Sequence, residues 1–310
     1  MNHTRITHHA WILLLLGAFQ GLLPQAGPSL TWAHAAPSTD EPSLLGTDME
    51  PLLSVATGAY DLPETLCRKT SKDVIIDGKL DEAAWQSASG LNFVDVVTAG
   101  PPLCGASEGF LLWNDKSLYV AVRARDKNTW ATMTLRDSPL CQEEVIEVFI
   151  DPDGDQKRYV EIEINPLNAI FDLRYAPDAS GAIKEDKTWN CPGLRHAVVV
   201  DGTLNRHDDI DREWTLEMAI PWEAFKGLNE EVSLPPKEGD TWRLNLYRYE
   251  RPNGPASPDR PVEYTAWSPT RHVNFHIPAC FGKTIFSHED SDLRASTCAL
   301  HAAKRNCLEK

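Results

Sequence analysis

The chain has 310 residues, of which 42% are hydrophobic, and its 45 acidic side chains outnumber its 30 basic ones to give a formal charge of −15. A charge of this sign and size argues against nucleic acid as a partner, because a phosphate backbone attracts basic surfaces. An acidic surface instead suits solubility, divalent cations or neutral polar ligands.

The first 35 residues have the pattern of a secretory signal peptide. Arg5 precedes the apolar run WILLLLGAF, which is too short to span a bilayer. Ala33-His34-Ala35 then supplies the small residues of a cleavage site. We therefore expect an exported protein, periplasmic or extracellular, with no later membrane span. Residues 36–58 mix proline, serine, threonine and acids without periodicity, which predicts a disordered linker.

Residues 59–287 are predicted to form one all-β domain, which is long enough to bury a large core. Short apolar segments separated by turn residues alternate along it. The strands predicted from this pattern are Val74–Asp77, Asn92–Val97, Gly109–Trp113, Leu118–Ala124, Val145–Ile150, Tyr159–Asn165, Ala169–Tyr175, Leu194–Val200, Trp214–Ile220, Trp242–Tyr249 and Lys283–Phe286.

Two brief helices are predicted between the strands, and a third after them. Asp81–Trp85 starts with a capping acid, and Pro221–Phe225 starts with proline. Residues 288–310 form a C-terminal tail in which Ser291–Lys310 is expected to be a short helix. Many regularly spaced strands with so little helix are typical of an antiparallel β-sandwich, jelly-roll or immunoglobulin-like.

Residues 143–175 predict a β-hairpin whose two faces differ in character. Strand side chains alternate between faces, so one face carries two aliphatic rows, Ile146, Val148 and Ile150 with Val160, Ile162 and Ile164. Pairing these rows sets Glu147 opposite Glu161 or Glu163 on the other face. Like charges opposed across two strands are unfavourable. That face must therefore be solvated, hold a cation, or use its acceptors on a polar ligand.

All the cysteines follow the predicted signal peptide. The seven are Cys67, Cys104, Cys141, Cys191, Cys280, Cys298 and Cys307. An exported chain can form disulfides, so we expect at least one and at most three, with the pairing left open. No two cysteines have the C-x-x-C spacing typical of zinc ribbons, redox pairs or covalently bound haem.

Seven segments in order resemble the family 9 carbohydrate-binding module. They are IDGKLDEAAW (76–85), LLWNDKSLYVAVRARD (111–126), RDS (136–138), EVFIDPDGD (147–155), EIEINPLN (161–168), WTLEMAIPWEAF (214–225) and GDTWRLNLYRYE (239–250). The similarity is strongest to stand-alone exported bacterial members. It implies a β-sandwich that binds oligo- or polysaccharides without cleaving them, aids polysaccharide breakdown beside glycoside hydrolases, and holds structural calcium.

The resemblance also implies residue roles, with departures. Glu147 matches the glutamate with which the family binds sugar. Cys141 and Phe275 stand where the family has the two tryptophans of an aromatic clamp, and Glu163 stands where it has a basic residue. The altered clamp leaves the fold expectation unchanged.

Other residues can replace the clamp. Trp130, Arg136 and Asp137 lie in the loop that enters the hairpin, and Trp189 lies in a second polar loop. Aromatic faces pack on sugar rings, while arginine and carboxylates bond hydroxyls; for both tryptophans, packing inside the protein is an equal alternative. The predicted ligand-binding set, with no catalytic residue, is Trp130, Arg136, Asp137, Glu147, Glu163, Asn165, Trp189 and Phe275.

A cation site is a further expectation. Asp151-x-Asp153-x-Asp155 clusters the oxygens that hard cations prefer, but Ile162 stands where a calcium loop has its bidentate glutamate, so a simple turn is favoured. Structural calcium therefore follows from the resemblance alone, with these aspartates as weak candidates. The face with Glu147 and Glu163 is another place for the ion.

Two other functions remain open. A glycoside hydrolase needs two carboxylates across a cleft, for which Glu147 and Glu163 are candidates, although carboxylates on adjacent strands rarely straddle a sugar ring. A non-covalent haem protein would use His196, His272, His276 or Met133, although a single histidine more often has another role.

Overall fold

The computed structural model describes residues 61–229, 231–254 and 262–292, which all belong to one structural unit. The predicted signal peptide, the linker and nearly all of the C-terminal helix lie outside these residues. Within the described part, none of the helices has the length and apolar character needed to cross a membrane.

The described residues form fourteen strands and four short 3-10 helices. The strands are β1 (Glu64–Lys69), β2 (Leu91–Asn92), β3 (Val94–Asp95), β4 (Ser107–Trp113), β5 (Ser117–Arg125), β6 (Val145–Asp151), β7 (Tyr159–Ile164), β8 (Ile170–Pro177), β9 (Ile183–Asp186), β10 (Arg195–Asp201), β11 (Glu213–Pro221), β12 (Thr241–Glu250), β13 (Glu263–Ala266) and β14 (Gly282–Asp290). The 3-10 helices are η1 (Trp85–Ser87), η2 (Leu140–Gln142), η3 (Trp222–Phe225) and η4 (Pro278–Cys280).

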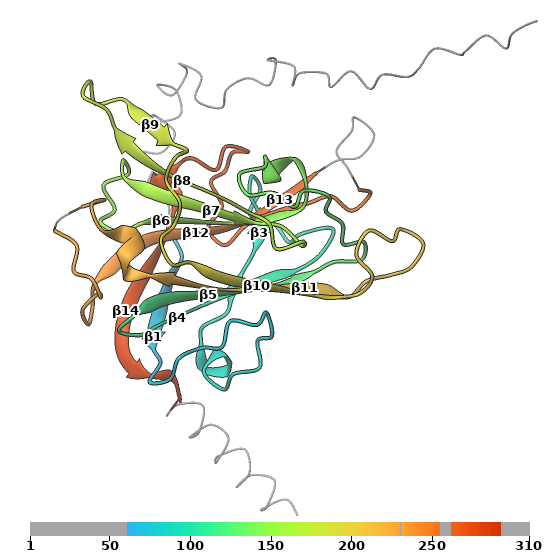
Figure 1. Cartoon of the computed structure of the whole chain (residues 1–310), viewed down its shortest axis with the longest axis horizontal. Coiled ribbons are helices and arrows are strands. Elements are labelled where there is room, and N and C mark those ends of the chain that lie inside the picture. The colour runs from blue at the N-terminus through green and yellow to red at the C-terminus, as the bar shows by residue number, and fades with distance from the viewer. Residues whose placement is uncertain (1–60, 230, 255–261, 293–310) are drawn as a thin grey trace, which may run out of the picture. The chain divides into compact units, whose positions relative to one another are not determined.

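The strands form two layers that are joined through β14 (Figure 1). One layer runs in the order β10-β11-β5-β4-β1, and the other in the order β12-β6-β7-β8-β9. β14 pairs with β1 on one side and with β12 on the other. The predicted sandwich is confirmed, but the sheet is mixed rather than purely antiparallel, because β1 pairs in parallel with both β14 and β4.

The core lies between the inner faces of the two layers. The aliphatic rows of β6 and β7 pack there against residues from β4, β5, β11 and β12, such as Leu111, Val120 and Leu216. Trp113, Trp222, Trp242 and Phe286 close one end of this core with edge-to-face contacts. The aliphatic face that the alternation in the sequence predicted for the hairpin is therefore the face that packs into the core.

The outer face of the β12-β6-β7-β8 layer is covered as well. Phe149, Tyr159, Tyr175 and Tyr247 point away from the main core and form a second cluster with Val96, Ala266, Phe275 and Phe281. The covering residues are Val96 directly after β3, Ala266 in β13, and Phe275 and Phe281 between β13 and β14. Tyr247 stacks on Phe275 with ring centroids 4.1 Å apart. This layer is therefore buried on both faces over much of its area.

Nine of the eleven predicted strands are confirmed within a few residues. Asn92–Val97 is instead two separate two-residue strands. Val74–Asp77 is not a strand: Glu217 in β11 accepts hydrogen bonds from the backbone N–H groups of Asp77 and Gly78, which hold this segment as a loop. β1, β9 and β13 were not predicted. The two predicted helices are 3-10 turns one residue or more later than expected.

No disulfide joins any two of the five cysteines in the described residues. The expected disulfide is therefore not found among them, and Cys298 and Cys307 lie outside the described residues. Burial raises the pKa of Cys191 to about 12 and that of Cys104 to about 11. Such thiols react slowly at neutral pH.

We expect thiol titration of the unfolded, unreduced protein to count three or more thiols, because the five described cysteines form no disulfide with one another and the other two cysteines can pair with at most two of them. The native protein at pH 8 should react much more slowly, since burial disfavours the thiolates. A count below three in denaturant would contradict the arrangement described here.

Candidate functional site

The hairpin β6–β7 brings three glutamates together on its outer face. Glu147 lies directly opposite Glu163, and Glu161 is two residues from Glu163 on the same face of β7. One carboxylate oxygen from each lies within 4.8 Å of the corresponding oxygens of the other two. We call Glu147, Glu161 and Glu163 the glutamate triad. Its register confirms the predicted opposition of Glu147 and Glu163.

The triad is buried, so its face is not solvated. Glu147, Glu161 and Glu163 are 2%, 5% and 4% exposed. Burial and the charge of Glu161 raise the pKa of Glu147 well above its usual value. Burial and the charges of Glu147 and Glu161 likewise raise the pKa of Glu163. Each ionised form is therefore costly where it stands.

The groups around the triad are mostly aromatic. The Tyr175 hydroxyl donates a hydrogen bond to Glu161 at 3.0 Å, whereas Glu163 Oε2 is buried without a hydrogen-bond partner. Burial and the triad's charges raise the pKa of Tyr249, which makes edge-to-face contacts with Tyr264 and Phe275. A polyhydroxy ligand could reach the triad only if this cover moved.

Two residues predicted to bind ligand have structural contacts instead. Trp130 is 3% exposed and its indole N–H donates to the Arg251 carbonyl at 3.2 Å. Asn165 donates to the Met133 carbonyl at 2.8 Å and accepts from the Ala169 N–H at 2.9 Å, so its amide shapes the β7–β8 turn. Trp130 is therefore not placed to stack on a sugar in this conformation. Sugar stacking and packing inside the protein were the two roles considered for Trp130, and the structure shows packing.

Three other predicted residues lie together at the surface. Arg136 and Asp137 are exposed, and the Arg136 guanidinium bonds Asn190, the neighbour of half-buried Trp189. Arg136 also pairs with Asp172 of β8. We call Arg136, Asp137, Trp189 and Asn190 the Arg136 patch. It combines an aromatic ring with exposed donors and acceptors.

Two hydrogen bonds connect the Arg136 patch to the sheet. Asp172 accepts from the Cys191 N–H at 2.7 Å, and this contact draws the loop with Trp189 onto β8. Asp137 has a left-handed backbone with φ 62°, and its N–H donates to the Ile170 carbonyl at 2.9 Å. Both loops are therefore held against one strand, although about 50 residues separate them in the sequence.

The Asp151–Asp155 segment is the predicted turn, with Gly154 at φ +68°. Asp151 accepts hydrogen bonds from the Gly154 and Gln156 N–H groups, each at 2.9 Å. Burial and the neighbouring Asp153 raise the pKa of Asp151 to about 7. The three aspartates also have oxygens within 4.8 Å of one another, but their backbone hydrogen bonds account for the arrangement without an ion.

A further cluster of charges was not predicted from the sequence as a group. Asp126, Glu144 and Glu250 are all buried, with oxygens within 4.8 Å of one another. Arg248, itself buried, pairs with Asp126 and Glu250. Alternation along β12 puts Arg248 and Glu250 on one face, but no sequence pattern shows that Asp126 and Glu144 come to meet them.

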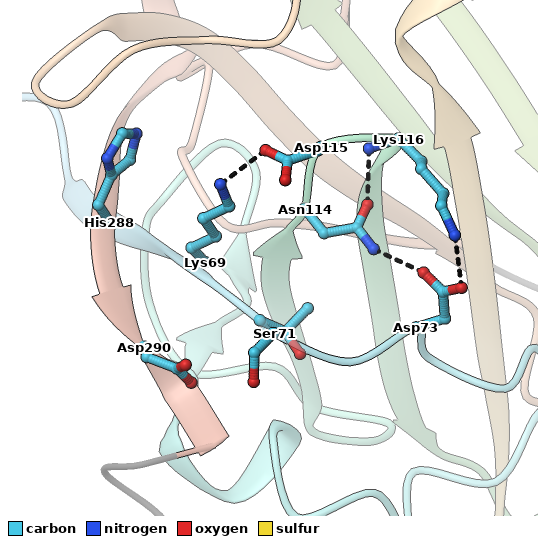
Figure 2. Close-up of a pocket in the computed structure, with 9 residues that line it drawn as sticks. Lys69, Ser71, Asp73, Asn114, Asp115, Lys116, His288 and Asp290 are labelled. Carbon is cyan, nitrogen blue, oxygen red and sulfur yellow. Dashed lines mark hydrogen bonds and ion pairs between the residues drawn. The ribbon is translucent and has the colours of Figure 1, made fainter.

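A polar pocket of about 530 Å³ lies where β1, β14 and the β4–β5 turn meet (Figure 2). Lys69 pairs with Asp115 at 2.6 Å, and Lys116 pairs with Asp73 at 2.7 Å. The Lys69 ammonium also lies 5.1 Å from the centre of the Trp113 ring. These charges neutralise one another, so the lysines of this pocket are engaged within the protein.

Comparison with known proteins places the fold and the site in a family. Residues 76–288 match the family described as carbohydrate family 9 binding domain-like. The chain belongs to this family. Among curated proteins, none matches the chain significantly. The family 9 match covers both the glutamate triad and the Arg136 patch, and it confirms the resemblance read from the sequence.

Three solved structures are similar to this chain. A Bacteroides uniformis protein to which carbohydrate binding is attributed has 17% identity and a TM-score of 0.52, with 73% of this chain and 100% of that chain covered. Family 9 modules of Caldicellulosiruptor kristjanssonii in complex with glucose and with cellotriose each have 16% identity. Their TM-scores are 0.47 and 0.46, with 73% of this chain and 97% and 95% of those chains covered. With 17% identity and a TM-score of 0.52, the Bacteroides uniformis structure shows a shared fold.

Proposed function

We propose that this family 9-like protein binds oligo- or polysaccharide without cleaving it, and that it acts after export, beside glycoside hydrolases. The family match over residues 76–288 is the observation that carries the proposal. The signal-peptide pattern of residues 1–35 supports export. The acidic charge of −15 favours a neutral ligand over a polyanion.

We place the first contact with the glycan at the Arg136 patch. The patch is the part of the predicted set that solvent reaches, with an Arg136 side chain that is 40% exposed. Trp189 packs partly against the main core, and the half that stays exposed offers a surface for stacking on a pyranose, while Arg136, Asp137 and Asn190 offer bonds to hydroxyls. The ion pair with Asp172 holds the Arg136 guanidinium in position, which lowers the entropy cost of binding.

The glutamate triad supports binding over hydrolysis. Hydrolysis needs one carboxylic acid and one carboxylate on opposite sides of a glycosidic bond, at least about 5 Å apart. Glu147 and Glu163 lie opposite each other on adjacent strands and are buried on one sheet face, so they do not flank a cleft that a sugar ring can enter. This arrangement argues against the hydrolase alternative at this position.

We expect Arg136→Ala and Trp189→Ala each to weaken glycan binding by about 1–3 kcal/mol, through lost charge-assisted bonds and lost stacking respectively. Isothermal titration calorimetry, with a glycan selected on an array using the mature protein, measures this. Trp130→Phe is the matched control, because it removes a buried indole N–H and leaves the patch intact. The titrations are run in EDTA, so that cation binding does not contribute.

Glu147→Gln decides whether the glycan also reaches the buried face predicted from the sequence. A loss of affinity of about 1–3 kcal/mol would show that the cover of Tyr249, Tyr264 and Phe275 opens on binding. Wild-type affinity in both patch variants would place the site away from the Arg136 patch. Failure of the wild type to bind any glycan on the array would refute the proposed function.

A further inference from the structure

The glutamate triad carries three carboxylates into a site with no basic partner. Among the ion pairs formed by the described residues, none involves Glu147, Glu161 or Glu163. The hydrogen bond from Tyr175 to Glu161 supplies one neutral donor. Burying several like charges without compensation costs far more than a single hydrogen bond returns. The native state must therefore neutralise the triad in another way.

One acceptor of the triad is left open. Glu163 is 4% exposed and its Oε2 has no hydrogen-bond partner. Buried polar atoms in folded proteins are nearly always satisfied, so this oxygen needs a partner, which either a proton shared with Glu161 or a bound cation would supply. Glu163 also faces Glu147 directly across the strand pair, which directs it into the cluster.

We propose that Glu147, Glu161 and Glu163 bind one divalent cation, and that this ion is Ca²⁺. Two oxygens that share a calcium ion at about 2.4 Å lie at most about 4.8 Å apart, and the three carboxylates meet this limit. Together they offer six oxygens, the lower end of calcium coordination. This assignment differs from the role that the family resemblance gives to Glu147, which is direct contact with sugar.

The chemistry of the site favours calcium over other ions. Three carboxylates form an all-oxygen ligand set, which suits hard cations rather than copper or zinc. Mg²⁺ usually keeps several of its waters, whereas aromatic side chains cover this site and leave each glutamate at most 5% exposed. Ca²⁺ has flexible geometry and tolerates carboxylates that bind through one or both oxygens.

The other two acidic clusters are weaker candidates within the same molecule. In the Asp126–Glu144–Glu250 cluster, the guanidinium of Arg248 already pairs with two of the three carboxylates. In the turn, Asp151 and Asp155 accept backbone hydrogen bonds, and Asp155 also pairs with Arg158. A cation would compete with arginine or backbone donors in both of these clusters. In the triad it would compete with the Tyr175 hydroxyl, which donates to Glu161.

The test uses the mature chain without glycan, stripped with EDTA and then dialysed against 1 mM CaCl₂ or buffer (about 1 mM spans the weaker protein sites). Elemental analysis counts bound calcium, and thermal unfolding measures its effect on stability. We expect one calcium per chain and a rise in Tm with calcium, since a ligand that binds only the folded state stabilises it. Glu163→Gln should weaken calcium binding about tenfold or more.

Matched variants locate the ion. Glu144→Gln and Asp153→Asn, one from each competing cluster, should retain calcium and the rise in Tm. In EDTA, Glu163→Gln should unfold at a higher temperature than the wild type, because it removes one uncompensated buried charge. Glu161→Gln repeats the test if Glu163→Gln fails to fold.

Two outcomes would overturn the proposal. One is a wild type that binds no calcium and shows no change in Tm. The other is calcium that is retained by Glu163→Gln or Glu161→Gln and lost in Glu144→Gln or Asp153→Asn. The proposal does not depend on the proposed function, because cation binding is measured without sugar and glycan binding is measured in EDTA.

Discussion

Replacing Arg248 with methionine is expected to destabilise the folded protein by about 3–5 kcal/mol. Arg248 is fully buried, and its Nη2 lies 3.0 Å from Asp126 while also bonding Glu250. Its Nη1 donates to the Arg125 carbonyl at 2.8 Å. Without the guanidinium, two buried carboxylates lose their only basic partner among the described residues, beside a third at Glu144.

Urea unfolding at pH 7, followed by tryptophan fluorescence, measures the loss. Arg248→Lys should cost less, because the charge remains while the forked hydrogen bonds are lost. A triple variant, Arg248→Met with Asp126→Asn and Glu250→Gln, should recover most of the stability, since Glu144 is then the only carboxyl left in the cluster and burial raises its pKa well above the usual value. A loss below about 1 kcal/mol for Arg248→Met, as for an exposed pair, would contradict this account.

Trp222→Ala is expected to cost about 3–5 kcal/mol of stability, the range for deleting a large buried ring. Trp222 is in η3, 5% exposed, and its ring centroid is 6.3 Å from Trp113, 5.8 Å from Trp242 and 6.2 Å from Phe286. These three residues belong to β4, β12 and β14, so the ring joins the two layers where β14 connects them. The cavity left by alanine would lie between the layers.

Trp222→Phe separates the ring from its polar group. The indole N–H donates to the Asn114 carbonyl at 2.9 Å, and phenylalanine keeps most of the packing while leaving that carbonyl without its donor. We expect a loss of about 1–3 kcal/mol for this variant. Differential scanning calorimetry of both variants is the measurement. An alanine variant as stable as the phenylalanine variant would show that Trp222 does not fill the core.

The sequence predicts most of the strands because their pattern is local. β7 and β11 alternate aliphatic residues with mostly polar ones, and β6 has an aliphatic residue at every second position; period two is a property of a single segment. β1 carries glutamate, arginine and lysine in six residues, so its pattern is weak. Its place in the sheet depends on parallel pairing with β14 and β4, which are distant in sequence.

The sequence predicted some features of the candidate site and missed others, and this difference has a physical cause. Pairing of two neighbouring strands brings Glu147 opposite a glutamate, Glu161 or Glu163, and this followed from the sequence; the structure selects Glu163. The exposure of each residue did not follow from the sequence, because it depends on what packs over the sheet. Trp130 and Trp189 both stand in polar loops, yet the first is buried beside Arg251 and the second lies half-exposed beside Asn190.

The sequence by itself therefore determined the all-β class, the inner aliphatic face of the hairpin, the turn at Asp151–Asp155 and the family, because each of these depends on local periodicity or on motifs in order. The tertiary structure decided which charges are buried. Segments distant in the sequence cover the outer face of β6 and β7 and convert a predicted solvated or sugar-binding face into an enclosed glutamate triad. Long-range packing of this kind has no period in the sequence, so only the folded chain shows that the three carboxyl groups are buried together.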